Sequence, residues 1–454
     1  MIRTHIDGQE VVVTKELVEK YNQAGPRYTS YPTAPNWNDH FGPNEFLGRL
    51  KETNKKEKSL SLYFHLPFCE ERCTFCACSV VATKQHSVVE PYLKALFKEI
   101  ENVGEVLDRA PPLEQLHWGG GTPTYLSADQ IEQLYENIGK YFSIADSAEV
   151  SIEIDPRVTT DDQLKTLRRL GFNRASLGVQ DFESEVQKLA GRIQSEEETR
   201  HAIVTCRSLG FESVNVDLVY GLPKQTQKTF EKTLQKILEL NPDRIALFNF
   251  AYVPWMHTHQ KKILEQDLPD AWTKLTMFCE AIRIFEDAGY EFIGLDHFAK
   301  KNDELSKARK EGTMYRNFQG YTTKANCDLI GLGVTSISFV SGAFSQNAKK
   351  LKDYEKGVSK NGFVTERGLV LSEDDLIRQK IIREIFCHQR VKADFDNYFK
   401  NEKERLRLLE KDGLVDLGAD QLRVTPLGRL FLRNIGMIFD AYLKPNQDRF
   451  SKTV

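Results

Sequence analysis

Four cysteines lie within ten residues of the sequence and offer a site for metal chemistry. They are Cys69, Cys73, Cys76 and Cys78, in YFHLPFCEERCTFCAC, with the spacing C-x3-C-x2-C-x-C. A short loop with this spacing can direct three thiolates to one point, and thiolate is the ligand that iron–sulfur clusters take. Three thiolates hold a four-iron, four-sulfur cluster by three corners. The fourth iron then has an open position, which separates a catalytic metal site from a structural one.

Two structural interpretations of these cysteines agree less well with the sequence. A zinc site usually takes two separated ligand pairs, and no second Cys or His pair has that spacing. Disulfide bonds are typical of exported proteins, but the eight cysteines are scattered and no signal peptide opens the sequence. The isolated cysteines are expected to be small buried hydrophobic residues; they are Cys206, Cys279, Cys327 and Cys387.

The composition predicts a globular protein of two or three domains. The chain has 454 residues, of which 28% are charged and 40% hydrophobic. Its net charge of −3 gives no electrostatic reason to expect nucleic-acid binding. No apolar run is long enough to cross a bilayer. We therefore expect a cytoplasmic protein that binds neither nucleic acid nor membrane, and nothing in the sequence demands more than a monomer.

From residue 59 onward, short apolar runs rich in β-branched residues alternate with amphipathic helical stretches. The expected strands cover residues 60–67, 113–120, 149–156, 174–180, 213–221 and 244–254. This alternation predicts right-handed crossovers between parallel strands. Six strand–helix units predict an α/β fold, a partial (β/α)6 barrel whose lateral gap can admit a large substrate. Residues 291–298 are expected to extend one edge of its sheet.

The remaining chain is expected to surround this barrel. We divide the sequence into an N-terminal arm (1–55), the barrel (56–300), a barrel-edge extension and connection (301–370) and a C-terminal domain (371–454). The arm contains PRYTSYPTAP, residues 26–35, whose prolines predict an extended segment. The C-terminal domain is predicted to be mainly helical, with a helix–hairpin–helix pattern similar to a winged-helix module. Its mixed charges favour a structural lid over DNA binding.

Unusual residues occur at the carboxyl ends of the expected strands, where parallel α/β folds place their sites. The cysteine loop follows the first strand, and GGGTPT, residues 119–124, follows the second. Glu153 and Asp155 end the third strand, Gln180 and Asp181 end the fourth, and Asp217 and Ala251 lie late in the fifth and sixth. Consecutive glycines let a backbone approach a ligand closely. Because no phosphate-binding motif accompanies them, their free N–H and C=O groups can equally hold an amino acid's ammonium and carboxylate.

Two carboxylates in this set have both functional and structural interpretations. Glu153 shares one strand face with Ser151 and Asp155, and it suits the hydroxyl pair of a ribose as well as a salt bridge to a neighbouring arginine. Asp217 lies in the apolar strand NVDLVYG, where a lone carboxylate is costly, which favours a functional role. The histidines at 65, 117, 257, 259 and 297 are expected to be core or rim residues rather than iron ligands.

These motifs together identify a family. The chain resembles the radical S-adenosylmethionine enzymes and, within them, the oxygen-independent coproporphyrinogen III oxidases, or coproporphyrinogen dehydrogenases. The resemblance includes GPRYTSYPTA, the cysteine loop, LHWGGGTPTYL, SIEIDPR, GFNRASLGVQDF, NVDLVYGLPKQT, GLDHFA, RNFQGYTT and DGLVD…VTPLGR. It implies a 4Fe-4S cluster and two molecules of S-adenosylmethionine as cofactors. Cys69, Cys73 and Cys76 match the cluster ligands, and Cys78 matches a fourth cysteine that does not bind the cluster.

The resemblance also implies which residues surround the two S-adenosylmethionine molecules. Positions around the first molecule match Tyr63, Gly120, Glu153 and Ile337. Positions around the second molecule match Phe75, Gly121, Thr122, Gln180, Arg192, Asp217 and Ala251. Tyr63 and Cys78 are also expected to take part in catalysis. Phe75 lies inside the cysteine loop, where its ring can pack on the face of an adenine.

The implied reaction belongs to haem biosynthesis. One electron from the cluster cleaves the sulfonium to methionine and a 5′-deoxyadenosyl radical, which takes a hydrogen from the β-carbon of a substrate propionate. Loss of carbon dioxide and one electron leaves a vinyl group, and two such steps convert coproporphyrinogen III to protoporphyrinogen IX. The sequence does not identify the electron donor. Arg27 and Arg316 are candidates to bind substrate carboxylates, because arginine pairs with carboxylate through two hydrogen bonds.

Two other functions compete with the oxidase. A haem-binding chaperone of the same superfamily would keep the cluster without the reaction. Such relatives generally lack an arm like PRYTSYPT and a cysteine at the position of Cys78, and this chain has both. A winged-helix regulator that senses redox state through the cluster would bind DNA with a steep salt dependence. The chain lacks the basic surface composition which that function requires.

Overall fold

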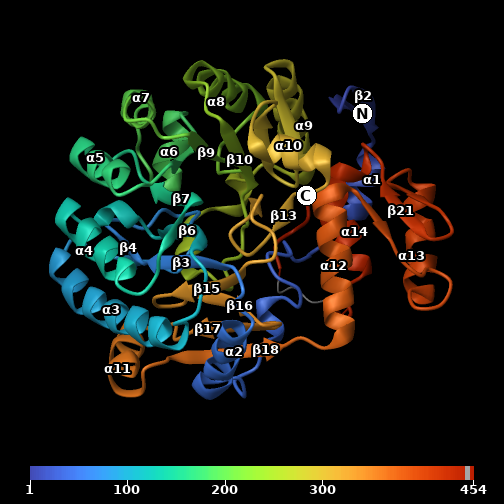
Figure 1. The fold of residues 1–454 in the computed structure, drawn as a ribbon. Coiled ribbons are helices and arrows are strands. Elements are labelled where there is room, and N and C mark those ends of the chain that lie inside the picture. Colours follow the sequence, from blue (N-terminus) through green and yellow to red (C-terminus); the bar gives the residue numbers. More distant parts are fainter. Residues whose placement is uncertain (445–449) are drawn as a thin grey trace.

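One large mixed sheet organises the molecule. The computed structural model describes residues 1–444 and 450–454, and in these residues the main sheet has twelve strands (Figure 1). Their order is β11-β12-β10-β9-β8-β7-β6-β3-β15-β16-β17-β18. None of the helices in the described residues combines the length and apolar character of a membrane-spanning segment.

The centre of the sheet is a run of parallel strands. They are β3 (Leu60–Leu66), β6 (Leu113–Gly120), β7 (Ile144–Ile154), β8 (Arg174–Gln180), β9 (Ser213–Tyr220) and β10 (Arg244–Asn249). Each pairs in parallel with the next, which confirms the predicted α/β fold with six parallel strands. The last strand ends at Asn249 rather than at residue 254. Beyond it, the side chain of Gln260 hydrogen-bonds to Val253 N and Ala251 O in place of a neighbouring strand.

Helices cover the outer face of this parallel run, as Figure 1 shows. They are α3 (Val89–Val106), α4 (Ala128–Gly139), α5 (Asp161–Arg169), α6 (Ser184–Ala190), α7 (Glu196–Ser208), α8 (Gln227–Leu240) and α9 (Ala271–Asp287). Helices α4, α5, α7 and α8 each begin at a Ser or Thr whose hydroxyl accepts a backbone hydrogen bond from three residues further on. Beneath them, Leu62, Leu116 and Ile152 are fully buried in the core.

Further strands extend the sheet at both edges. Beside β10 lie β12 (His297–Lys300) and β11 (Tyr290–Gly294), both antiparallel, which confirms the predicted extension by residues 291–298. Beside β3 lies β15 (Asp328–Leu332), a further parallel strand. The antiparallel strands β16 (Ile337–Val340), β17 (Ala343–Asn347) and β18 (Thr365–Val370) follow it. Helices α10 (Glu304–Glu311) and α11 (Leu351–Asn361) lie in this part of the chain. The division into four regions remains a prediction.

The N-terminal residues are more structured than an extended arm. They form a hairpin of β1 (Ile2–Ile6) and β2 (Gln9–Val13), followed by α1 (Lys15–Tyr21) and α2 (Pro43–Lys55). The proline-rich segment between these helices contains a single 3-10 turn, Ala34–Asn36. Tyr28 and Tyr31 in this segment are buried. Their hydroxyls bond to Asp440 (2.9 Å) and to Ala441 N (3.1 Å), so the segment packs against the C-terminal region.

The C-terminal region forms a smaller unit beside the barrel (Figure 1). It consists of α12 (Glu373–His388), β19 (Arg390–Lys392), α13 (Lys400–Lys411), β20 (Val415–Leu417), β21 (Gln421–Val424), the 3-10 turn Gly428–Phe431 and α14 (Leu432–Ile438). The three strands pair as an antiparallel sheet in the order β19-β21-β20. A hairpin following a helix and preceding another is the winged-helix-like arrangement that the sequence predicts.

Candidate active site

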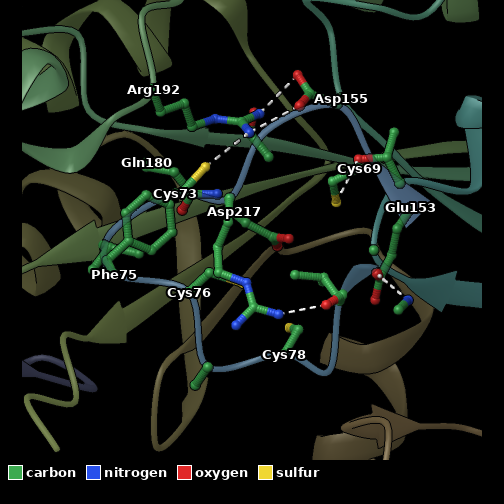
Figure 2. A pocket seen from close by; sticks show the side chains of 18 of the residues that line it. Cys69, Cys73, Phe75, Cys76, Cys78, Glu153, Asp155, Gln180, Arg192 and Asp217 are labelled. Atoms are coloured by element: carbon green, nitrogen blue, oxygen red, sulfur yellow. Dashed lines mark hydrogen bonds and ion pairs between the residues drawn. The ribbon is translucent and has the colours of Figure 1, made fainter. Parts of the chain in front are cut away.

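A cavity of about 640 Å³ opens at the carboxyl ends of the parallel strands. Its volume lies within the range of roughly 300–1,000 Å³ that is usual for small-molecule sites. Most of the residues predicted to bind the cluster or S-adenosylmethionine line it: Cys69, Cys73, Phe75, Cys76, Gly120, Gly121, Thr122, Glu153, Gln180, Arg192, Asp217 and Ala251. Cys78, which is predicted to take part in catalysis without binding the cluster, lines it as well. Figure 2 shows side chains of the cysteine loop and of the strand ends around this cavity.

The cysteine loop is fixed to the barrel by backbone hydrogen bonds. It leaves β3 through the two-residue strand β4 (Phe68–Cys69), which pairs with β5 (Val81–Ala82). Thr74 N donates to Ala190 O (2.9 Å) on one side of the loop. On the other, His259 Nε2 bonds to Cys76 O (2.8 Å). These contacts hold the cysteine loop beside the cavity.

The four thiols of the loop are all free, and their environments differ. Burial raises the pKa of the Cys69 thiol to about 11. A hydrogen bond from Cys78 lowers the pKa of Cys76 to about 7, despite the burial of Cys76. In the described part of the chain, no three Cys, His, Asp or Glu side chains converge as ligands of a single metal ion. Three thiols that line one cavity can serve as ligands of a cluster, in which each thiolate binds a different iron.

The glycine-rich segment joins the cysteine loop to the end of β6. Gly121 N donates to Leu66 O and Thr122 N donates to Phe68 O, each at 2.8 Å. Gly121 has no space for a side chain, because a Cβ there would lie 2.7 Å from the backbone of Pro67 and Phe68. Gly120 has a φ of 117°, which favours glycine. The segment therefore needs glycine for its own packing as well as for any ligand.

Glu153 lies at the end of β7 and faces the glycine-rich segment. It accepts a hydrogen bond from Gly120 N (3.1 Å) and lies 3.5 Å from His117 Nε2. Burial acts to raise the pKa of Glu153, but the bonds and charge from His117 and the Gly120 N–H outweigh it, and the pKa is lowered. Glu153 is therefore a carboxylate at neutral pH and can accept further hydrogen bonds from a bound ligand.

Arg192 is held by Asp155, a strand-end carboxylate to which the family resemblance assigns no role. Arg192 forms a two-point ion pair with Asp155, whose second arginine partner is Arg157. Arg192 also donates to Gly178 O (2.7 Å), and its Nη1 lies 4.0 Å from Cys73 Sγ. Burial acts to raise the pKa of Asp155, but the two arginines outweigh it and lower the pKa. The guanidinium thus has a fixed position beside the cysteine loop.

Asp217 and Gln180 form the opposite part of the wall. Asp217 accepts hydrogen bonds from Ser176 Oγ (3.2 Å) and Asn215 Nδ2 (2.7 Å), and no cation within the described residues forms an ion pair with it. Burial and the nearby charge of Glu153 raise the pKa of Asp217 to about 6. Gln180 has a φ of 72° where the pairing of β8 with β9 shifts register. Left-handed backbone at a residue other than glycine is typical of functional sites.

Two predicted site residues do not line the cavity. Tyr63 projects from β3, where its hydroxyl lies 3.0 Å from His65 Nδ1 and its ring stacks on His117. Ile337 begins β16 and packs in an apolar cluster with Trp37 and Phe344. Tyr63 lies beside the site, because His117 in turn lies next to Glu153, whereas Ile337 contacts apolar residues outside the cavity wall. Their predicted roles remain predictions.

The sequence did not predict three residues that position Asp155 and the cysteine loop. Arg157 fixes Asp155, while His259 and Gln260 bind the backbone of the cysteine loop at Cys76 and Phe75. The SIEIDPR motif contained a usable signal for Arg157, because an arginine two residues after a strand-end carboxylate is a natural partner. Side chains that bond to backbone carbonyls, such as those of His259 and Gln260, cannot be recognised from the sequence in this way, because every residue has a carbonyl.

Comparisons with known proteins agree with this site. Residues 63–237 match the model of the radical SAM superfamily. The chain is 46% identical to the oxygen-independent coproporphyrinogen III oxidase of Synechocystis sp., with 98% of each chain covered. It is 44% identical to the oxidase of the same name from Escherichia coli, with 96% of this chain and 98% of that protein covered.

A solved structure agrees as closely. The coproporphyrinogen III oxidase (HemN) from Escherichia coli, a radical SAM enzyme, superposes with a TM-score of 0.91 at 42% identity and covers 96% of this chain and 100% of its own. The barrel and the cysteine loop at its cavity, together with these relatives, define the class of the protein. It is a radical S-adenosylmethionine oxidoreductase. The chain belongs to the family of oxygen-independent coproporphyrinogen III oxidases. Its cofactors are a 4Fe-4S cluster and S-adenosylmethionine.

Proposed function

We propose that the main cavity is where this chain oxidatively decarboxylates two propionates of coproporphyrinogen III, giving protoporphyrinogen IX. The observation that carries the proposal is that three thiols and ten further residues, all assigned to the site by family resemblance, line a single cavity at the strand ends. In this proposal Cys69, Cys73 and Cys76 each bind one iron, and Cys78 stays free. When bound, the cluster and S-adenosylmethionine supply an electron and a carbon radical that can take hydrogen from a propionate β-carbon.

The first S-adenosylmethionine is proposed to lie between the cysteine loop and the glycine-rich segment. Backbone groups of Gly120 and the carboxylate of Glu153 provide hydrogen-bonding partners for its amino acid and ribose parts. Because Glu153 is already oriented by Gly120 N and His117, little freedom is lost when a ligand binds. Tyr63 is proposed to support this arrangement through His117, on which its ring stacks at 5.8 Å. Ile337 is assigned to the same molecule on family resemblance alone.

The second S-adenosylmethionine is proposed to lie on the side of Phe75, Gly121, Thr122, Gln180, Arg192, Asp217 and Ala251. The pairing of Arg192 with Asp155 fixes the guanidinium, so it can meet a ligand carboxylate without reorganising. Asp217 has spare acceptor capacity for hydroxyls, because its partners among the described residues are the neutral side chains of Ser176 and Asn215. Phe75 offers an apolar face to an aromatic base.

The rest of the chain is proposed to exclude water from the reacting groups. A primary-carbon radical takes hydrogen from almost any C–H bond, so the site must be closed when it forms. Residues 1–55 and 371–454 are our candidates for closing it, because the segment at Tyr28 and Tyr31 packs on the C-terminal region. Residues 56–300 form the barrel and residues 301–370 its edge in this proposal. We further propose a cytoplasmic monomer that receives electrons from a separate donor and binds neither nucleic acid nor membrane.

Anaerobic reconstitution tests the proposed function. The purified chain is loaded with iron and sulfide, then incubated with a reductant, S-adenosylmethionine and coproporphyrinogen III. Mass spectrometry of the porphyrins should show stepwise loss of two carboxyl groups. Cys73→Ser should lose the cluster absorbance and the cleavage of S-adenosylmethionine. Cys78→Ser, the matched control in the same loop, should retain the absorbance.

The result that would overturn this function is a reconstituted cluster that cleaves S-adenosylmethionine while coproporphyrinogen III is recovered unchanged. Titration with haem in the same preparation tests the chaperone alternative. Tight stoichiometric haem binding without turnover would favour that alternative. Turnover without tight haem binding would support the oxidase.

A further inference from the structure

A second, smaller cavity adjoins the main one on the side of the C-terminal region. Its volume is about 150 Å³, and it shares Arg27, Phe248 and Asn249 with the wall of the main cavity. A water molecule takes up roughly 30 Å³ of liquid, so the space suits a side chain of a ligand and not a tetrapyrrole ring. A molecule in the main cavity can therefore extend one arm into the smaller one.

Three arginines from three separate parts of the chain line this smaller cavity. Arg27 comes from the N-terminal segment, Arg316 ends the short strand β13 (Tyr315–Arg316), and Arg433 lies on α14. Arg429 also lines it but is ion-paired with Asp7. The acidic side chain in the wall is Asp296, whose carboxylate is bonded to His297 Nδ1 at 2.6 Å. The wall thus carries more positive than negative side-chain charge.

Within the described residues, the three arginines donate to neutral oxygens, which are backbone carbonyls apart from the hydroxyl of Ser451. Arg27 donates to Asn249 O, and Arg316 donates to Tyr28 O. Arg433 donates to Pro26 O (3.1 Å) and Lys452 O (2.8 Å), among other carbonyls of the same two segments. Among residues 1–444 and 450–454, no carboxylate side chain forms an ion pair with any of the three. Burial acts to raise the pKa of Asp296, but His297, Arg27 and Arg316 outweigh it and lower the pKa, so among the described side chains Asp296 is the one nearby counter-charge in this wall. One carboxylate leaves the three guanidinium groups with a net positive charge, which a bound anion can neutralise.

The electrostatics of the neighbouring groups agree with an excess of positive charge. Burial, together with the charge of Arg27, lowers the pKa of Arg433 to about 9. Lys274, which donates to Val454 O at 2.8 Å, has its pKa lowered to about 8 by burial and by the charge of Arg433. Cations that repel one another in this way favour an anionic ligand between them. Guanidinium groups match carboxylates in particular, because each can form two parallel hydrogen bonds.

We propose that this cavity binds the carboxylate of a propionate that does not react, while the macrocycle occupies the main cavity. The proposal rests on the proposed function, since it assumes a ligand with several propionates. Arg27, Arg316 and Arg433 bind the carboxylate and so fix which edge of the macrocycle faces the cysteine loop. Because the three come from the N-terminal segment, the barrel edge and α14, the subsite is complete only when these parts are packed together. Substrate binding then depends on the closed form of the molecule.

Binding of two stable porphyrins to the reconstituted holoenzyme tests this inference separately from turnover. Coproporphyrin III carries four propionates, whereas mesoporphyrin IX keeps the two that do not react and has ethyl groups in place of the others. Quenching of the fluorescence of the four tryptophans measures both affinities. Arg433→Gln should raise the Kd of both porphyrins by about 10- to 100-fold, the range for losing a charged hydrogen bond. Arg433→Lys should restore part of the affinity.

Controls separate binding from folding and from the proposed function. Arg405→Gln is matched to Arg433→Gln, because Arg405 lies on α13 and also bonds to backbone oxygens, those of Ile438 and Met437, but lines neither cavity. It should leave both Kd values unchanged. If Arg433→Gln does not fold, Arg27→Gln carries the test, since in the part of the chain that the structure describes the Arg27 side chain has one hydrogen bond, to Asn249 O.

Three outcomes decide the matter. A parallel rise of both Kd values supports the subsite, whether or not the enzyme turns over coproporphyrinogen III. Unchanged Kd values for both porphyrins in folded Arg433→Gln and Arg27→Gln would overturn it. A loss for coproporphyrin III alone would also overturn it, because the arginines would then bind a propionate that reacts. Failure of the proposed function would instead appear as absent product with the arginine dependence of binding intact.

Discussion

Arg192 and Asp155 meet in a two-point ion pair at the wall of the main cavity, with 3.0 Å between Nη1 and Oδ2 and 3.0 Å between Nη2 and Oδ1. Both side chains are only 9% exposed. Arg157 binds the same carboxylate from the loop after β7. Asp155 therefore neutralises two arginines and positions one of them beside the cysteine loop.

Replacing Asp155 by Asn should destabilise the protein. The amide keeps the shape but leaves the buried Arg192 and the half-buried Arg157 without their counter-charge. Breaking a buried pair in this way costs roughly 3–5 kcal/mol. Urea unfolding of the reconstituted protein near neutral pH measures the change. The exposed pair of Asp161 with His201 provides the control, because Asp161→Asn removes a carboxylate from water-accessible surroundings. Equal unfolding midpoints for Asp155→Asn and wild type would show that the pair contributes no net stability.

Replacing Glu153 by Gln should weaken S-adenosylmethionine binding while the cluster remains. Glutamine is similar in shape to Glu153, but it lacks the negative charge of the carboxylate, which Gly120 N and His117 hold in position. Loss of one charged hydrogen bond predicts a rise in Kd of about tenfold or more. Equilibrium binding to the reconstituted protein measures it, with iron content as the check on the cluster. Glu149→Gln is the control, since Glu149 lies on the same strand and pairs with Arg174 away from the cavity. A tenfold effect of both variants would point to a general change in β7.

Replacing Gly121 by Ala should displace the cysteine loop. A Cβ at this position would lie 2.7 Å from backbone atoms of Pro67 and Phe68, which cannot move as a side chain can. Overpacking of this kind costs roughly 1–3 kcal/mol, and here the strain falls next to Cys69. Reduced iron incorporation and a lower urea midpoint are the expected results. Gly139→Ala is the matched control, because nothing lies within 4 Å of a Cβ on Gly139 at the end of α4. Full iron incorporation by Gly121→Ala would contradict the prediction.

The sequence predicted those parts of the site that depend on short-range patterns. The spacing of Cys69, Cys73 and Cys76 is local, and the apolar run at 149–156 predicts both the strand and the place of Glu153 near its end. The parallel pairing of β15 with β3 was not predicted, because it joins residues 328–332 to residues 60–64 and leaves no pattern in either segment. The position of Arg433 was missed for the same reason. It meets Arg27 only after two distant segments have packed together.

Family resemblance and geometry also separate at particular residues. Resemblance assigned Tyr63 and Ile337 to the first S-adenosylmethionine, yet neither lines the main cavity, and Ile337 packs against Trp37 and Phe344 instead. Conversely, Asp155 lines the cavity and fixes Arg192 although resemblance gave it no role. A motif records which residues recur, whereas contacts record which side chains hold others in place. Residues such as Asp155, which hold another side chain in place, are therefore harder to predict from the sequence.

Replacing Asp217 by Asn should change how stability depends on pH. Burial and the charge of Glu153 raise the pKa of Asp217 from 3.8 to about 6. A carboxyl whose pKa rises on folding stabilises the folded state below its unfolded pKa, and this contribution is lost as pH rises through the folded pKa. Asn cannot titrate, so without S-adenosylmethionine the variant should gain stability over wild type between about pH 4 and pH 6 and keep the gain at higher pH. Urea midpoints across this interval measure the difference, and Asp146→Asn, at an exposed position of β7, controls for the loss of one charge. A difference between Asp217→Asn and wild type that stays constant with pH would contradict the raised pKa.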